Sequence, residues 1–353
     1  MFEKTTVLSG LVAALCGAYS VHNLSLASAG GAVAVTAQTP TADAQTTKVV
    51  SAANAFLGAL STDQKSKMSF AFTDAAQRAR WSNFPTGIFQ RVGLRWGDMS
   101  AAQRTDLMNL LGTVLSADGL KMVQEQMDAD EVLKTTGGGQ LVFGSAEYYV
   151  AFLGTPSTTS PWMLQFGGHH LALNATVVGS NITLAPSLTG GQPVKYTLDG
   201  KTVYIVGQEV KDAFAMVGSL DVAQRSKAVI STKNIDLVLG PGQDAKTLQA
   251  EGLPGSAMTA AQKTQFLALI KDRMGALNAD DLTPKMADIE KNLDKTYFAW
   301  YGPTTAGSAA YYRVTGPTVL IEFSPQQMGG DATNHIHSMY RDPTNDYGTA
   351  WTK

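Results

Sequence analysis

Four of the chain's five histidines occur as two closely spaced pairs. His169 and His170 follow two glycines, and His335 and His337 enclose a single isoleucine. The remaining histidine, His22, lies in the apolar N-terminal region. Imidazole nitrogens are ligands for zinc and for copper. The two pairs therefore predict one metal centre, holding zinc or copper, that is assembled from distant parts of the sequence.

The spacing within each pair predicts how many ligands it supplies. Side chains alternate between the faces of a strand, so His335 and His337 would point the same way and clamp one ion. His169 and His170, if they lie in a strand, would point to opposite faces. The face of His170 continues into the polar Asn174, which favours His170 as the third ligand. Three imidazoles and an open position match the ligand count of a catalytic zinc site, and His169 is the candidate for a closed four-histidine site.

Acidic and cationic side chains near these motifs offer further chemistry. Glu322 follows an apolar strand-like run and is the candidate acid–base residue. Arg341 would bind a carboxylate or phosphate of a substrate, or else pair with a neighbouring aspartate. The carboxylates that could complete a metal shell are Glu322, Asp342, Asp346 and Glu147.

The composition excludes several other kinds of site. Net charge is -2 and the pI is near 6.2, so no basic field favours nucleic acid. Cys16 is the sole cysteine, which excludes disulfides and Cys-based metal motifs. The sequence contains no G-x-S-x-G elbow, P-loop or H-E-x-x-H motif.

The first 47 residues predict export. Lys4 precedes a mostly apolar run over residues 7–21, and residues 27–29 form an A-x-A cleavage site, so residues 1–29 resemble a signal peptide. Residues 30–47 are Ala, Thr, Gly and Gln with few large apolar groups, which predicts a flexible linker. We expect a periplasmic or extracellular protein with no membrane span in the mature chain. An uncleaved N-terminal anchor is the alternative.

The rest of the chain has the pattern of an internal duplication. Four segments recur in the same order at nearly constant spacing: 60–67 with 220–227, 99–105 with 258–264, 115–120 with 277–282, and 149–154 with 297–302. This predicts a first repeat over residues 48–208 and a second over 209–353. The two repeats would pack as a pseudo-twofold pair.

Each repeat places helices before strands. Four capping boxes mark helix starts, at Ser61/Gln64, Ser100/Gln103, Asp221/Gln224 and Thr259/Gln262. Runs rich in aromatic and β-branched residues predict strands over residues 148–153, 162–166, 171–178, 297–301, 311–315 and 319–323. Helices followed by strands, twice over, predict an α+β fold with antiparallel sheet.

The repeats differ where the histidines lie. His169 and His170 align with Thr318 and Val319 in the second repeat, and only the second repeat continues into the H-x-H segment. A site assembled once, from both repeats, fits this asymmetry.

The two histidine motifs resemble those of one bacterial family, catalogued as domain of unknown function 3500. The similar segments are Gly168 to Leu171, the run from Gly316 to Glu322, and Asn334 to His337 with the Arg-Asp-Pro and Asp-Tyr-Gly stretches after it. The Arg80-Trp81 stretch and the helix start at residues 100–104 are also similar, so the resemblance extends from about residue 50 to the end. It implies a shared fold and site, and no characterised activity.

Three functions follow as alternatives. The first is a metal-dependent enzyme, hydrolytic with zinc or oxidative with copper, acting on a small molecule. The second is a non-catalytic periplasmic metal-binding or delivery protein. The third is a module whose histidines only form hydrogen bonds, and it predicts that the two motifs lie far apart.

Overall fold

The computed structural model describes residues 42–136, 141–327 and 330–352. The predicted signal peptide and most of the predicted linker lie outside this range. The described residues combine nine α-helices with one large sheet, which confirms the α+β class.

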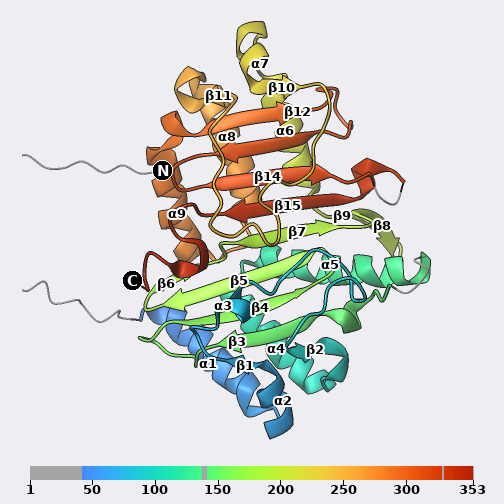
Figure 1. The fold of residues 1–353 in the computed structure, drawn as a ribbon, viewed down its shortest axis with the longest axis vertical. Coiled ribbons are helices and arrows are strands. Elements are labelled where there is room, and N and C mark those ends of the chain that lie inside the picture. The colour runs from blue at the N-terminus through green and yellow to red at the C-terminus, as the bar shows by residue number, and fades with distance from the viewer. Residues whose placement is uncertain (1–41, 137–140, 328–329, 353) are drawn as a thin grey trace, which may run out of the picture. The chain divides into compact units, whose positions relative to one another are not determined.

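Thirteen strands of the described chain form the large sheet, in the order β1-β3-β4-β5-β7-β15-β14-β13-β12-β10, with β2, β6 and β11 paired to its members (Figure 1). The pairs are antiparallel except β1 with β3 and β10 with β12, so the sheet is mixed at its edges. The strand bounds are β1 Ser69–Phe70, β2 Leu94–Arg95, β3 Tyr149–Leu153, β4 Trp162–Gly168, β5 Leu171–Val178, β6 Asn181–Thr183, β7 Ser187–Gly191, β10 Val229–Ser231, β11 Leu253–Pro254, β12 Tyr297–Tyr301, β13 Tyr311–Thr315, β14 Leu320–Pro325 and β15 Ile336–Arg341, with β8 Lys195–Leu198 and β9 Lys201–Tyr204 forming a separate hairpin. All six strands predicted from sequence are present.

The helices begin where the sequence predicts. All four capping boxes form, with the cap side chain bound to a backbone N–H and the glutamine bound back to the cap. The helix bounds are α1 Ala44–Gly58, α2 Thr62–Met68, α3 Ala75–Arg78, α4 Ala101–Val114, α5 Ala117–Thr136, α6 Gly207–Gly218, α7 Val222–Ala228, α8 Ala260–Met274 and α9 Ala279–Lys291. Within the part of the chain that is described, every helix is too short or too polar to cross a bilayer.

The first helix begins earlier than its apolar residues indicate. Helix α1 begins at Ala44, inside the segment assigned to the linker. Asp43 accepts a hydrogen bond from the backbone N–H of Thr46, and Thr46 is itself buried. A local cap therefore starts the helix earlier than its apolar residues indicate.

The two faces of the sheet are covered differently. Long helices pack on one face, and the loops 71–93 and 232–252 cross the other (Figure 1). Along β15, Ile336 joins the main core, whereas Met339 packs with Trp81 and Leu188 in a smaller cluster under the loops. Because side chains alternate between the faces of a strand, the odd-numbered side chains of β15 lie on the loop-covered face.

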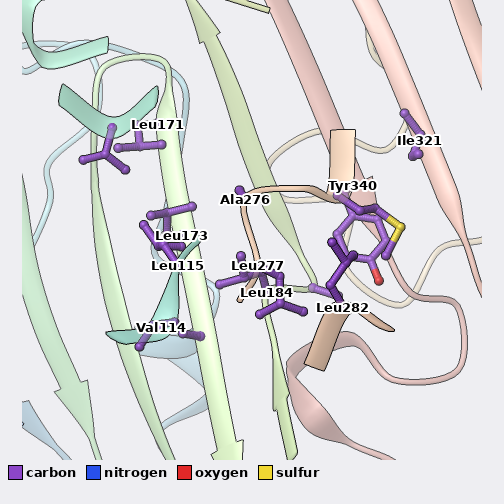
Figure 2. Close-up of a cluster of buried hydrophobic side chains, with 14 of the residues drawn as sticks. Val114, Leu115, Leu171, Leu173, Leu184, Ala276, Leu277, Leu282, Ile321 and Tyr340 are labelled. Atoms are coloured by element: carbon purple, nitrogen blue, oxygen red, sulfur yellow. The ribbon is translucent and has the colours of Figure 1, made fainter. Parts of the chain in front are cut away.

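The middle of the fold is the contact between the first and second halves of the chain. Strands β7 and β15 pair antiparallel there. On the helix-covered face, Leu115 and Leu277 form an isolated bridge, flanked by hydrogen bonds from Ser116 N to Ala276 O (2.9 Å) and from Asn278 N to Val114 O (3.2 Å). Figure 2 shows these leucines among the buried side chains of both halves.

We expect Gln262→Ala to lower the free energy of unfolding by roughly 1–2 kcal/mol. The substitution removes the glutamine of the α8 capping box and its hydrogen bond to the residue that ends α6. Gln262 accepts from Thr259 N and donates to Ser219 O, both at 2.9 Å. Gln103→Ala should cost a similar amount, since Gln103 makes the equivalent bonds to Ser100 N and Ala59 O. Urea unfolding measures both, with the exposed Gln249→Ala as the control. A Gln262→Ala loss no larger than that of Gln249→Ala would contradict this account.

Candidate metal centre

His169 and His170 occupy the turn between β4 and β5. Gly168 pairs with Leu171, so the two histidines form a two-residue hairpin connection. Neither histidine lies in a strand, so the alternation of faces considered for this pair does not apply. The backbone of His170 has φ 60°, which two-residue hairpin turns commonly require and which histidine tolerates better than most residues. A side chain at position 168 would lie 2.7 Å from the ring of Tyr148, so glycine is required just before the turn.

His335 and His337 lie at the start of β15. His337 is opposite Gly190 of β7 on one side and Ser324 of β14 on the other. Ile336, between the histidines, packs into the main core on the opposite face. The strand alternation expected for the H-x-H motif is present.

The structure brings His170, His335 and His337 together. One ring nitrogen from each lies within 4.8 Å of the others, and all three side chains are buried. Nε2 of His170 is 2.9 Å from Nε2 of His335. Two imidazole ligands on a tetrahedral zinc ion are about 3.3 Å apart, so small side-chain shifts would seat an ion among them. Among the described residues, this is the one group of three or more His, Cys, Asp or Glu side chains placed to hold a metal.

Burial keeps two of these rings in the form that binds metals. It lowers the pKa of His170 and that of His337 well below the usual histidine value, and the charges of the neighbouring histidines lower both further. A neutral imidazole has a free lone pair, and a ligand that carries no proton at neutral pH loses none on binding a metal. The donor set therefore fits zinc or copper.

His169 points away from this triad. Its Nδ1 lies 2.7 Å from Oδ1 of Asp130, a buried residue of α5, and its ring contacts that of His170 at a tilt of 40°, with centroids 3.8 Å apart. Its backbone carbonyl accepts a hydrogen bond from the hydroxyl of Tyr148 at 3.0 Å. These contacts hold the hairpin turn that presents His170.

Two residues that sequence reasoning did not assign to the site also contact it. Nδ2 of Asn83 is 3.2 Å from Nε2 of His337, and its carbonyl accepts from His170 N at 3.2 Å. Arg91 donates from Nη2 to the carbonyl of Gly168 at 2.6 Å. Its burial lowers its pKa to about 10, so it remains a cation at neutral pH. The only sequence signal was the Arg-Trp-Ser-Asn stretch at residues 80–83, which the family resemblance had already singled out.

Glu322 and Arg341 are bound to the loop that covers the sheet. Glu322 accepts from the backbone N–H groups of Val238 and Leu239 and from the hydroxyl of Tyr311, each at 2.7 Å. Arg341 donates to the carbonyl of Leu239 at 2.9 Å. The guanidinium also pairs with the carboxylates of Asp244 and Asp346. Both side chains are buried and hold the loop in place.

The other candidate carboxylates also have partners outside the triad. Asp342 pairs with Lys285, and Glu147 pairs with Arg95. The group of three histidines contains no carboxylate.

Comparison with known proteins identifies one family. The family model described as "Protein of unknown function (DUF3500)" matches residues 42–349. The match confirms the resemblance seen in the histidine motifs. Searches of curated proteins and of solved structures gave no match.

We expect the metal-free protein to lose stability as the pH falls below about 6.5, the pKa of histidine in an unfolded chain. Below that pH His170 and His337 become protonated in the unfolded state but stay neutral in the folded state, because their folded pKa values are lower. Proton uptake therefore favours unfolding. The loss approaches about 1.4 kcal/mol per pH unit for each histidine until the folded pKa is reached. Urea unfolding at pH 5 and pH 7 with a chelator measures it.

The control is His170→Gln/His337→Gln, which removes both groups. Its free energy of unfolding should fall less than that of the wild type between pH 7 and pH 5. Equal losses in the two proteins would show that neither histidine has a lowered pKa.

Proposed function

The chain belongs to the DUF3500 family, and we propose that it is a metal-dependent enzyme whose histidine triad binds the metal ion. The observation that carries this proposal is the convergence of His170, His335 and His337 from motifs far apart in the sequence. Three buried imidazoles with no carboxylate beside them leave a coordination position for an outside ligand.

The chain's own residues hold the site and limit its access to water. A bound zinc ion would supply Lewis acidity for hydrolysis, and a bound copper ion would supply redox chemistry for oxidation. The bond between His169 and Asp130 holds the turn that presents His170. The three residues of the triad are 4% to 7% exposed, so a small molecule is the substrate class that suits the site.

The roles of Glu322 as acid–base residue and of Arg341 as substrate clamp stay proposals. Either role requires the side chain to exchange its present bonds to the loop for bonds to a substrate. Glu322 lies on β14 two residues before Ser324, which is paired with His337, so it is on the same face of the sheet as the triad.

Non-catalytic metal binding or delivery is the second candidate. The observation that favours it is the burial of all three rings, because a buried ion is retained and is poorly accessible to a substrate. A closed four-histidine site would require Nε2 of His169 to turn toward the triad, to which it does not belong here. The bond from its Nδ1 to Asp130 could remain, as in carboxylate–histidine pairs at metal sites.

We also propose that the fold arose by duplication, with repeats over residues 48–208 and 209–353, after an export signal over residues 1–29 that directs the protein to the periplasm or outside the cell. The order of helices and strands in the two halves supports the duplication. The bridge between Leu115 and Leu277 supports it too, because these residues are equivalent in the sequence repeat. Gln64 bonds to Gln103 in the first half as Gln224 bonds to Gln262 in the second.

We expect the purified protein to hold about one zinc or copper ion per chain, and His335→Ala/His337→Ala to hold none, because it removes two of three ligands. Elemental analysis after reconstitution and desalting measures the metal content.

His169→Ala is the matched control, because it removes a histidine of the same cluster that is not in the triad. It should still bind one ion, because all three ligands of the triad remain. Metal retained by the double variant, or absent from the reconstituted wild type, would refute the proposed function.

A further inference from the structure

Asn83 joins two ligands of the triad from a loop that contains neither histidine motif. Its backbone carbonyl accepts a hydrogen bond from His170 N at 3.2 Å. Its Nδ2 is 3.2 Å from Nε2 and 3.5 Å from Nδ1 of His337. The side chain is buried, and its amide nitrogen faces the triad. Asn83 therefore contacts the ligand from the β4–β5 turn and the ligand from β15.

The amide of Asn83 does not occupy the lone pair that a metal would use. The two nitrogens of an imidazole lie on either side of one carbon, and their lone pairs diverge. A donor placed on one lone pair would be much farther from the other nitrogen. Since Nδ2 is almost equally far from both nitrogens of His337, it lies beside the ring and out of line with either lone pair. The donor is thus next to the coordination site and does not block it.

A buried guanidinium fixes Asn83 in this position. Nη2 of Arg91 donates to the carbonyls of Ser82 and Phe84, both at 2.7 Å, on either side of Asn83. The same nitrogen donates to Gly168 O at the start of the histidine turn. Arg91 thereby ties the Asn83 loop to the turn that carries His170.

The charge of the site favours an anion. Three uncharged imidazoles would leave a divalent ion with its full charge in a buried place, and the triad includes no carboxylate. Burying an unbalanced charge is costly, so a negative ligand is favoured over a neutral one.

We propose that the metal centre takes a small anion at its fourth position, and that Asn83 donates a hydrogen bond from Nδ2 to that anion. The inference rests on the proposed metal-binding function. The class of ligand is an anionic oxygen or nitrogen donor, such as the carboxylate of a small acid. Asn83 would be a binding residue of the centre, and Arg91 the residue that positions it.

The test compares an anionic and a neutral ligand on the full-length protein loaded with Co²⁺. Azide and imidazole are titrated separately, and the visible absorption of the bound cobalt reports each affinity. The variants are Asn83→Leu and Asn83→Ser, and Asn181→Leu at the exposed end of β6 is the control. Two replacements of different size are used in case one of them disturbs the fold. Circular dichroism checks that each variant is folded.

We expect both Asn83 variants to bind azide about tenfold more weakly or worse, because each loses a hydrogen bond to a charged group. Their affinities for imidazole and for Co²⁺ should match the wild type, since neither needs the Asn83 donor. Asn181→Leu should match the wild type throughout.

Unchanged azide affinity in the two variants would overturn the inference and leave the metal site standing. An equal loss for azide and imidazole would also overturn it, because Asn83 would then only shape the cavity. If the wild type takes up no Co²⁺, the proposed function fails, and the inference fails with it.

Discussion

The pairing of β7 with β15 is the contact on which the site depends. Strand β7 lies between β5 and β15, so it sets the C-terminal H-x-H motif beside the turn that leads into β5. In this register His337 is opposite Gly190. A shift of one residue would send both His335 and His337 to the helix-covered face and Ile336 out of the core. The hydrophobic core that fixes the register therefore also fixes the metal ligands.

The second constraint is burial of polar groups. Burial lowers the pKa of His170 and that of His337, so both rings are neutral, and residues on both faces of the sheet hold the segments that carry the site. Asp130 on a helix holds His169, while Arg91 in the opposite loop holds Asn83 and the turn. An imidazole cluster held in this way keeps its lone pairs available for a metal and loses little entropy on binding it.

The sequence predicted the features that depend on local rules. Capping boxes are set by residues three apart, and the H-x-H geometry follows from strand alternation, so both are present as expected. Whether His169 and His170 lie in a strand or a turn could not be settled from sequence, because a two-residue turn leaves no periodic pattern. Asn83 could not be found, because it meets His337 across 254 residues of chain with no periodic signal. The structural bonds of Glu322 were equally hidden, since they come from a loop with no regular pattern.

X-ray diffraction from crystals of the protein soaked with Zn²⁺, recorded on both sides of the zinc absorption edge, tests the central claim most directly. The account predicts one anomalous peak per chain, at about 2.0–2.1 Å from a ring nitrogen of each of His170, His335 and His337, as zinc–imidazole bonds require. Electron density that lies on the zinc beside Asn83 and does not belong to the protein would then show the outside ligand. A peak elsewhere, or no peak between the three histidines at saturating zinc, would contradict the account.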